Sequence, residues 1–279
     1  MKLFAPFTGL IFLISVFADQ INCQTMDDDI QNYNLYNAQY IQFSSAEVDD
    51  TFKLFISVPD KYSNSSKAYP VLYVLDGDIA FGMATSIARY LQVGGNIPEL
   101  IIVGIGYGSI DKSAGNKRKR DYGSLQTGGI ENFMNFLKSE LIPFIDSNYR
   151  TINGDRIIYG YSIGGLFALY TLFTQPDTFN SYIIGSPHLD WNDFSIFTYE
   201  ESSSEKIGDA KIKLFISVGS EESEEKYFNP IDSLVTKIQE RNYSRLTLGP
   251  KVFDGSSHLT GPAEALTYGL LSVIGRNDK

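Results

Sequence analysis

Cysteine is almost absent from this sequence of 279 residues, which contains only Cys23. An internal disulfide needs two cysteines, and a structural zinc site needs several cysteine or histidine ligands. Both are therefore excluded for the mature domain, and we expect no metal ion and no cofactor. The fold must depend on its hydrophobic core, which is feasible because a domain of this length buries roughly 70 to 75% of its unfolded surface.

Positive charge is also scarce, because 23 Lys and Arg stand against 33 Asp and Glu, a net charge of −10. With this balance we expect no broad, positively charged surface that could bind a phosphate backbone, so nucleic acid is not an expected partner. The basic run Lys117–Arg120 is expected on a solvated loop. Arg118, Lys119 and Arg120 would either border a pocket for an anionic substrate or form salt bridges within that loop, and the sequence leaves both open.

No apolar run reaches the roughly 18 residues that are needed to cross a bilayer. Near the N-terminus, Lys2 precedes the apolar stretch 10–17, whose length suits the hydrophobic region of a secretory signal. We expect residues 1–23 to be a signal peptide, cleaved after Ala18 or after Cys23. A buried N-terminal segment and a lipid-anchored Cys23 are the alternatives. Residues 24–279 are then one secreted or periplasmic domain without stable membrane insertion.

Short apolar segments alternate with helical patterns along the chain, which predicts an α/β fold. The expected strands are 40–43, 52–58, 71–75, 100–105, 156–159, 182–184, 213–218 and 246–253. The expected helices are 79–91, 130–145, 163–173, 230–241 and 263–274. The first two strands read as an antiparallel pair, and several others are apolar on both faces, as in a parallel sheet covered by helices. We therefore predict a sheet of about eight mostly parallel strands with helices on both faces, and a polar surface loop or small insertion at 200–209.

The motif Gly160-Tyr161-Ser162-Ile163-Gly164 directly follows one of these strands and directly precedes an apolar helix. A sharp turn from strand to helix would raise the Ser162 hydroxyl above the sheet edge, as in the nucleophile elbow of α/β-hydrolases. The same turn would aim the Ile163 amide at the space where an oxyanion forms. Ser162 is therefore the predicted nucleophile, and the alternative is an ordinary Gly-Ser turn.

A serine needs a base, and the chain offers only two histidines, His188 and His258. His258 lies after the last expected strand and before the last helix, where the order serine, acid, histidine places the base in this fold. His188 follows Ser162 too closely to leave a strand for the acid. We predict His258 as the base and His188 as a residue that lines a pocket or the surface.

The acid should follow the penultimate strand, where the loop 219–225 contains four glutamates. The usual spacing from Gly219 selects Glu222, and Glu221 is the second candidate. The other oxyanion donor should come from the loop after the first parallel strand, and we predict the backbone amide of Asp78. The carboxylates of Asp76 and Asp78 suggest a metal ligand or a helix cap, and the cap is favoured because no histidine is nearby.

Together these segments resemble the esterase D type group of α/β-hydrolases over nearly the whole mature chain. The resemblance is carried by Val74–Asp78, Arg120–Tyr122, Gly160–Gly165, Ser186-Pro187, Gly219–Glu222 and Ser257-His258. It implies a serine ester hydrolase with Ser162 as nucleophile and His258 as base. The most similar branch consists of secreted and periplasmic enzymes that open trilactone siderophores, and it usually carries serine where this chain has His188. The wider group also acts on acetyl or feruloyl sugars and S-formylglutathione, and one branch transfers mycolyl groups.

The predicted function is hydrolysis of a small-molecule carboxylic ester, on a siderophore or another compound, through an acyl-enzyme. An acyltransferase would use the same nucleophile and pass the acyl group to an alcohol. A noncatalytic binding module on the same fold is the alternative from another class, because a fold alone does not determine function.

Overall fold

Eight strands form one mixed sheet in the computed structural model of the protein, which describes residues 35, 37–123, 127–207 and 210–276. In order across the sheet they are β1 (Ala38–Ser45), β2 (Asp50–Ser57), β4 (Ile101–Gly106), β3 (Tyr69–Val74), β5 (Thr151–Tyr161), β6 (Ser181–Gly185), β7 (Ile212–Gly219) and β8 (Leu246–Phe253). β2 pairs antiparallel with both β1 and β4, and all other neighbours are parallel. The predicted fold class is confirmed, and each predicted strand overlaps an observed one.

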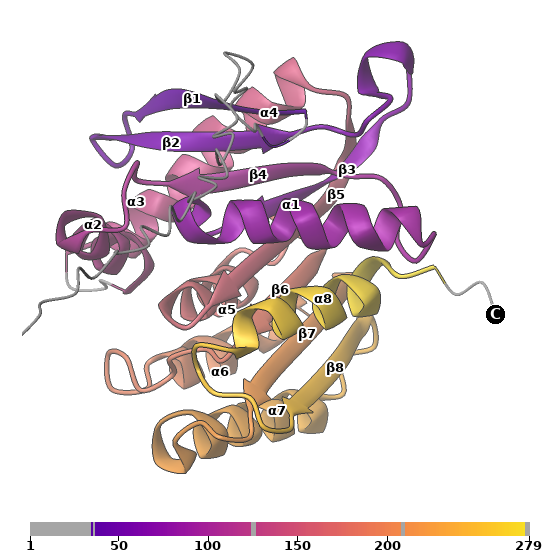
Figure 1. Cartoon of the computed structure of the whole chain (residues 1–279). Coiled ribbons are helices and arrows are strands. Elements are labelled where there is room, and N and C mark those ends of the chain that lie inside the picture. Colours follow the sequence, from indigo (N-terminus) through magenta and orange to yellow (C-terminus); the bar gives the residue numbers. More distant parts are fainter. Residues whose placement is uncertain (1–34, 36, 124–126, 208–209, 277–279) are drawn as a thin grey trace, which may run out of the picture. The chain divides into compact units, whose positions relative to one another are not determined.

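Helices cover both faces of this sheet, with α1 and α8 on one face (Figure 1). The helical segments are η1 (Tyr62–Asn64), α1 (Gly77–Val93), α2 (Lys112–Gly123), α3 (Gly129–Asn135), the π-helix η2 (Phe136–Leu141), α4 (Ile142–Asn148), α5 (Ile163–Thr174), α6 (Ile196–Ile207), the π-helix η3 (Glu224–Phe228), α7 (Asn229–Arg241) and α8 (Gly261–Ile274). The five predicted helices are all present. The one predicted over 130–145 consists of three consecutive segments, α3, η2 and α4.

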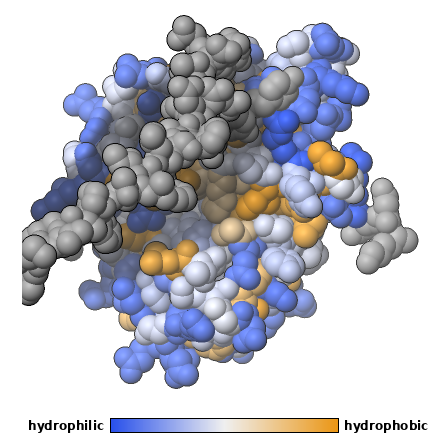
Figure 2. Space-filling model, in the orientation of Figure 1, coloured by the Kyte–Doolittle hydropathy of each residue, from blue (hydrophilic) through white to orange (hydrophobic). Residues whose placement is uncertain are grey.

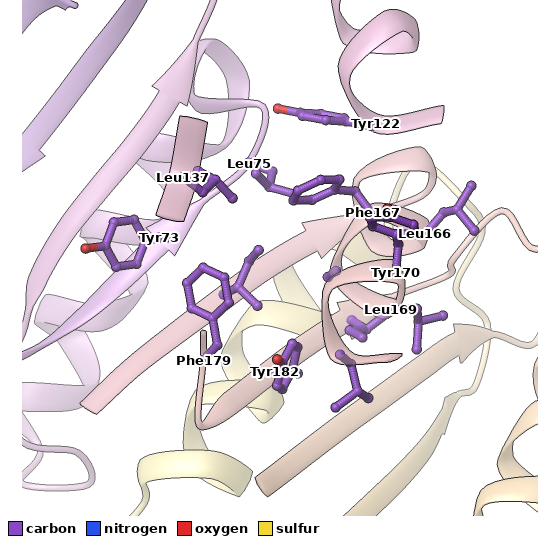
Figure 3. Close-up of a cluster of buried hydrophobic side chains, with 14 of the residues drawn as sticks. Tyr73, Leu75, Tyr122, Leu137, Leu166, Phe167, Leu169, Tyr170, Phe179 and Tyr182 are labelled. Atoms are coloured by element: carbon purple, nitrogen blue, oxygen red, sulfur yellow. The ribbon is translucent and has the colours of Figure 1, made fainter. Parts of the chain in front are cut away.

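The core explains why the strands and α5 carry apolar residues on every side. α5 is buried along residues 163–173 because it lies between the sheet and the helices outside it. Figure 3 shows its side chain Phe167 near Leu75 at the end of β3 and near Tyr122 of α2. Phe167 is fully buried, with its ring centroid 5.0 Å from that of Phe133. This packing fixes the N-terminus of α5 at the edge of the sheet.

Two segments that we predicted as loops are helices. The basic run Lys117–Arg120 lies within α2, and the predicted loop 200–209 begins inside α6. α6 buries Ile196, Ile207 and also Glu200, whose fully buried carboxylate accepts a hydrogen bond from Arg241 Nε at 3.0 Å. An ion pair between this buried carboxylate and the exposed Arg241 thus replaces part of the apolar stripe by which a helix is usually recognised.

The predicted signal peptide, residues 1–23, lies outside the described residues. Contacts group Leu35–Lys279 as one compact unit, which contains the whole sheet. In the part of the chain that the structure describes, no helix combines the length and the hydropathy that a membrane span requires.

Candidate active site

Ser162 occupies the sharp turn between β5 and α5 that the sequence predicts. Its φ and ψ of 57° and −120° lie outside the ordinary regions for a residue with a side chain. A β-carbon at Gly160 would lie 2.2 Å from the carbonyl oxygen of Gly164, so only glycine permits this turn. The turn is also anchored to β6, because the Ser162 amide donates to the Gly185 carbonyl at 3.0 Å. Backbone strain of this kind is often found where a side chain must be presented for chemistry.

His258 and Glu222, the predicted base and acid, form a close pair. Nδ1 of His258 lies 2.7 Å from Oε2 of Glu222, whose side chain is fully buried, whereas about a third of the His258 side chain is exposed. Glu221, the second candidate, is exposed. Glu222 is therefore the acid that can orient the His258 ring, and its carboxylate would stabilise the imidazolium that forms when His258 accepts a proton.

The other oxygen of Glu222 is also held. Oε1 accepts hydrogen bonds from the Gly219 amide at 3.0 Å and from the Ser186 hydroxyl. Burial raises the pKa of Glu222, but hydrogen bonds from His258, Ser186 and Gly219 bring it below its ordinary value. Ser186 was noted in the sequence only as part of a family motif, and the structure shows it as the donor that fixes the acid.

Tyr227 is a neighbour of the site that the sequence analysis missed. It lies in η3, is only 9% exposed, and its ring centroid is 4.6 Å from that of His258. Burial raises the pKa of its hydroxyl, and the nearby Ser162 side chain opposes this shift. No spacing rule points to a tyrosine five residues after the acid, although π-helical turns are frequent at functional sites.

Within the described ranges, Ser162 and His258 are not hydrogen-bonded to each other, but both line one cavity of about 490 Å³. Hydrogen bonds of the catalytic groups are commonly long or unformed before substrate binds. The other lining residues are Leu75, Asp76, Asp78, Ile79, Ala80, Met83, Tyr107, Ser109, Ile110, Ala114, Gly115, Arg118, Tyr159, Tyr161, Leu259 and Pro262. The cavity therefore extends from the nucleophile over the start of α1.

The two predicted oxyanion donors lie in the first turns of two helices. Asp78 is the second residue of α1 and Ile163 the first residue of α5. Amides at these positions have no carbonyl partner within their own helix, so both are available as donors. A β-carbon at Gly77 would lie 2.7 Å from the Ile105 amide nitrogen, and glycine therefore lets α1 begin close to β4.

The predicted helix cap by Asp76 or Asp78 is wrong, since α1 has no side-chain cap. Asp76 instead forms a two-pronged ion pair with Arg118, with distances of 2.5 and 2.9 Å. Asp78 turns toward β4 and accepts from the Tyr107 amide at 2.5 Å and the Gly108 amide at 3.1 Å. Both carboxylates hold the walls of the site together.

The arginines of α2 also differ from the predicted solvated loop. Arg118 reaches the Tyr161 carbonyl at 3.2 Å in addition to Asp76. Arg120 pairs with Asp50 at 3.0 Å and with the buried Asp121 at 2.5 Å. Both arginines form internal salt bridges, and Arg118 also lines the cavity beside Ser162, so the two readings hold together for Arg118.

His188 lies beside the site and apart from Glu222. Its Nε2 is 2.6 Å from Asp190 Oδ1, and its ring centroid is 5.7 Å from that of Tyr227. Burial lowers the pKa of His188, and the Asp190 carboxylate opposes the shift. His188 is not among the residues that line the cavity with Ser162, and of the two histidines only His258 pairs with Glu222. Among the residues with a described position, no three His, Cys, Asp or Glu side chains gather as metal ligands.

Comparison with known proteins decides the family. Residues 45–247 match the Esterase family, described as "Putative esterase". The chain belongs to this family. The ferri-bacillibactin esterase BesA of Bacillus subtilis is 34% identical over 172 residues, which are 53% of this chain and 57% of BesA. The chain thus matches little more than half the length of this relative.

Solved structures extend the likeness over most of the fold. The BES protein from Bacillus cereus matches with a TM-score of 0.80 and 28% identity, covering 88% of this chain and 97% of that one. An IroE-like serine hydrolase from Shewanella oneidensis matches with a TM-score of 0.74 and 26% identity, covering 84% and 79%. The predicted family and fold are confirmed, and these relatives support the predicted class of serine ester hydrolase.

Proposed function

We propose that this protein is a serine hydrolase of small-molecule carboxylic esters. The observation that carries the proposal is the pair of the buried Glu222 and the partly exposed His258, 2.7 Å apart, in which His258 lines the same cavity as the strained Ser162. These are the nucleophile, base and orienting acid of the serine hydrolase mechanism. The three groups come from three different loops, which all lie at the same edge of the sheet.

In the proposed reaction, Nε2 of His258 takes the proton of the Ser162 hydroxyl while Oγ bonds to the ester carbonyl carbon. The amides of Asp78 and Ile163 then stabilise the oxyanion, and losing one such donor costs about 2.7 to 4 kcal/mol of barrier. The carbon–oxygen bond to the alcohol breaks as His258 returns the proton to that alcohol. Water, deprotonated by the same ring, attacks the acyl-enzyme and releases the acid and Ser162.

Substitution of Ser162 by alanine tests the reaction. Ser162→Ala should abolish hydrolysis of p-nitrophenyl acetate and labelling by a fluorophosphonate probe. Ser203→Ala is the matched control, since this buried serine of α6 donates to a carbonyl of its own helix, that of Glu200, at 2.9 Å. Full activity in Ser162→Ala would refute the mechanism. An inert but folded wild-type protein would instead favour the noncatalytic binding module.

Siderophore esters are the substrate class we propose, because BesA is named a ferri-bacillibactin esterase. A panel of ferric and iron-free siderophores, feruloyl esters and acetylated sugars, compared by kcat/KM, tests this choice. Adding competing alcohols to the same assays separates a hydrolase from an acyltransferase, because only the latter would give new esters as its main product.

We further propose that residues 1–23 direct export and that residues 24–279 form the single mature domain, secreted or periplasmic. The support is the apolar stretch after Lys2 and the compact unit Leu35–Lys279. N-terminal sequencing of exported protein would distinguish cleavage after Ala18 from cleavage after Cys23. Retention of residues 1–23 would refute the proposal.

A further inference from the structure

The rim of the cavity beside Ser162 is unusually apolar for an exposed surface. Ile79 at the start of α1 is 68% exposed, Ile110 after β4 is 72% exposed, and Leu259 before α8 is 88% exposed. The three residues come from three separate segments that meet at this cavity. Figure 2 views the side of the molecule on which α1 and α8 lie, and it shows hydrophobic surface among the hydrophilic residues there.

The walls continue this apolar character inward. Leu75, Ala80, Met83 and Pro262 line the cavity below the rim. Binding pockets for small molecules are mostly apolar, with a few polar groups that orient the ligand, and a volume of about 490 Å³ lies within their usual range. Large aliphatic side chains exposed together around such a pocket mark a surface that a ligand covers.

The charged groups in the wall do not offer a site for an anion. Two carboxylates, Asp76 and Asp78, face one guanidinium, Arg118, whose fork is occupied by Asp76 and the Tyr161 carbonyl. Asp78 is balanced only by two backbone amides, which carry no net charge. A carboxylate or catecholate of a substrate would meet a wall of net negative charge here. It would lose its hydrating water without gaining a positively charged partner.

We propose that this cavity binds an uncharged, apolar part of the ester, attached to the carbonyl carbon that Ser162 attacks. The inference rests on the proposed esterase function and narrows its substrate. An anionic part of a siderophore, such as an iron–catecholate centre, would then lie outside this cavity. The kcat/KM of an ester should therefore increase with the apolar surface area of the acyl group that the cavity buries.

The test compares the hydrolysis of p-nitrophenyl esters by the mature protein. The neutral esters are the acetate, butyrate and hexanoate, and the adipate monoester and the 6-aminohexanoate are their charged six-carbon counterparts. Each methylene group that is completely buried strengthens binding about three- to fourfold. Hexanoate has four more methylene groups than acetate, so kcat/KM should rise at least tenfold from acetate to hexanoate even if burial is incomplete. The adipate monoester should fall at least tenfold below hexanoate, because its carboxylate meets the net negative wall. The 6-aminohexanoate ester should also fall below hexanoate, because its ammonium loses its water in an apolar cavity. Equal or faster hydrolysis of either charged ester, or no rise with chain length, would overturn the inference.

A pair of variants locates the effect. Ile110→Ser should lower the hexanoate-to-acetate ratio of kcat/KM at least threefold, because it removes an apolar side chain from the rim. Val93→Ser is the matched control, since Val93 is 90% exposed at the far end of α1 and does not line the cavity. An unchanged ratio in Ile110→Ser would refute this location. If activity survives in Ser162→Ala, the proposed esterase mechanism is refuted. If Ser162→Ala is inactive but kcat/KM of the unsubstituted enzyme does not change with chain length, only the proposed apolar cavity is refuted.

Discussion

Oε2 of Glu222 lies 2.7 Å from Nδ1 of His258, whereas Glu221, one residue earlier, is exposed. The loop after β7 produces this difference. The Glu221 amide donates to the Ser256 carbonyl at 3.0 Å, and the Gly219 amide donates to Glu222 Oε1 at 3.0 Å. These bonds turn the second glutamate inward and leave the first in solvent. These two neighbouring carboxylates thus differ in burial, and the Ser186 hydroxyl and the His258 ring hold the buried one as well.

The two glutamates therefore give a matched pair of variants. Glu222→Gln should lower kcat for p-nitrophenyl acetate roughly 100- to 10,000-fold, because the neutral amide no longer stabilises the imidazolium or fixes its tautomer. Glu221→Gln should stay within about twofold of the unsubstituted enzyme, since exposed substitutions away from special features have small effects. Steady-state kinetics on both variants is the measurement. Equal losses in the two variants would contradict the assignment of the acid.

Glu222 should also make stability depend on pH. Its hydrogen bonds hold its pKa in the folded protein below the ordinary value of 4.5, so the folded state favours the carboxylate. The stabilisation is fully present above that ordinary value and is lost as the pH falls through the lower folded pKa. The gap in thermal midpoint between the wild type and Glu222→Gln should be constant from pH 7 to about pH 5 and narrow below that. A gap that widens in acid would reverse the sign and refute this account.

Most of the fold could be predicted because its signals are local and apolar. The parallel strands are short runs of Val, Ile and Leu, and α5 is apolar along its whole length, so periodicity and order were enough. The turn at Ser162 was predictable too, since Gly160 and the flanking strand and helix are adjacent in sequence. Nothing in these signals depends on a distant partner.

The features that the sequence did not reveal depend on contacts between distant residues. α2 buries only Ala114, Asp121, Tyr122 and Gly123, and it is held by ion pairs to carboxylates of other elements. A helix without an apolar stripe resembles a solvated loop in sequence. The position of Tyr227 likewise depends on the path of η3, which brings its ring close to those of both His188 and His258.

Tyr227 should influence the reactivity of Ser162. Tyr227→Phe keeps the ring against His258 and removes the hydroxyl, so kcat/KM and the rate of fluorophosphonate labelling should both fall roughly 3- to 10-fold. The thermal midpoint should change little. Tyr268→Phe is the control, because Tyr268 is half exposed on α8 and packs on Phe253 away from the nucleophile. A labelling rate equal to that of the control would show that the hydroxyl does not act on Ser162.

Arg118 should stabilise the site by joining two of its loops. Its guanidinium bonds both carboxylate oxygens of Asp76, just before α1, and the carbonyl of Tyr161, just before Ser162. Arg118→Met leaves a partly buried carboxylate without its cation, so the free energy of unfolding should fall by about 1 to 3 kcal/mol.

Lys119→Met is the matched control for Arg118→Met, since the adjacent Lys119 is exposed on the same helix and its removal should cost less than about 0.5 kcal/mol. Urea unfolding of both variants measures the difference. Because Asp76 and Tyr161 each lie two residues before one of the proposed oxyanion donors, kcat should fall in Arg118→Met as well, even for the uncharged p-nitrophenyl acetate. A normal kcat for this ester with a loss confined to anionic esters would instead mean that Arg118 binds substrate charge, and would contradict its role as a clamp between the loops.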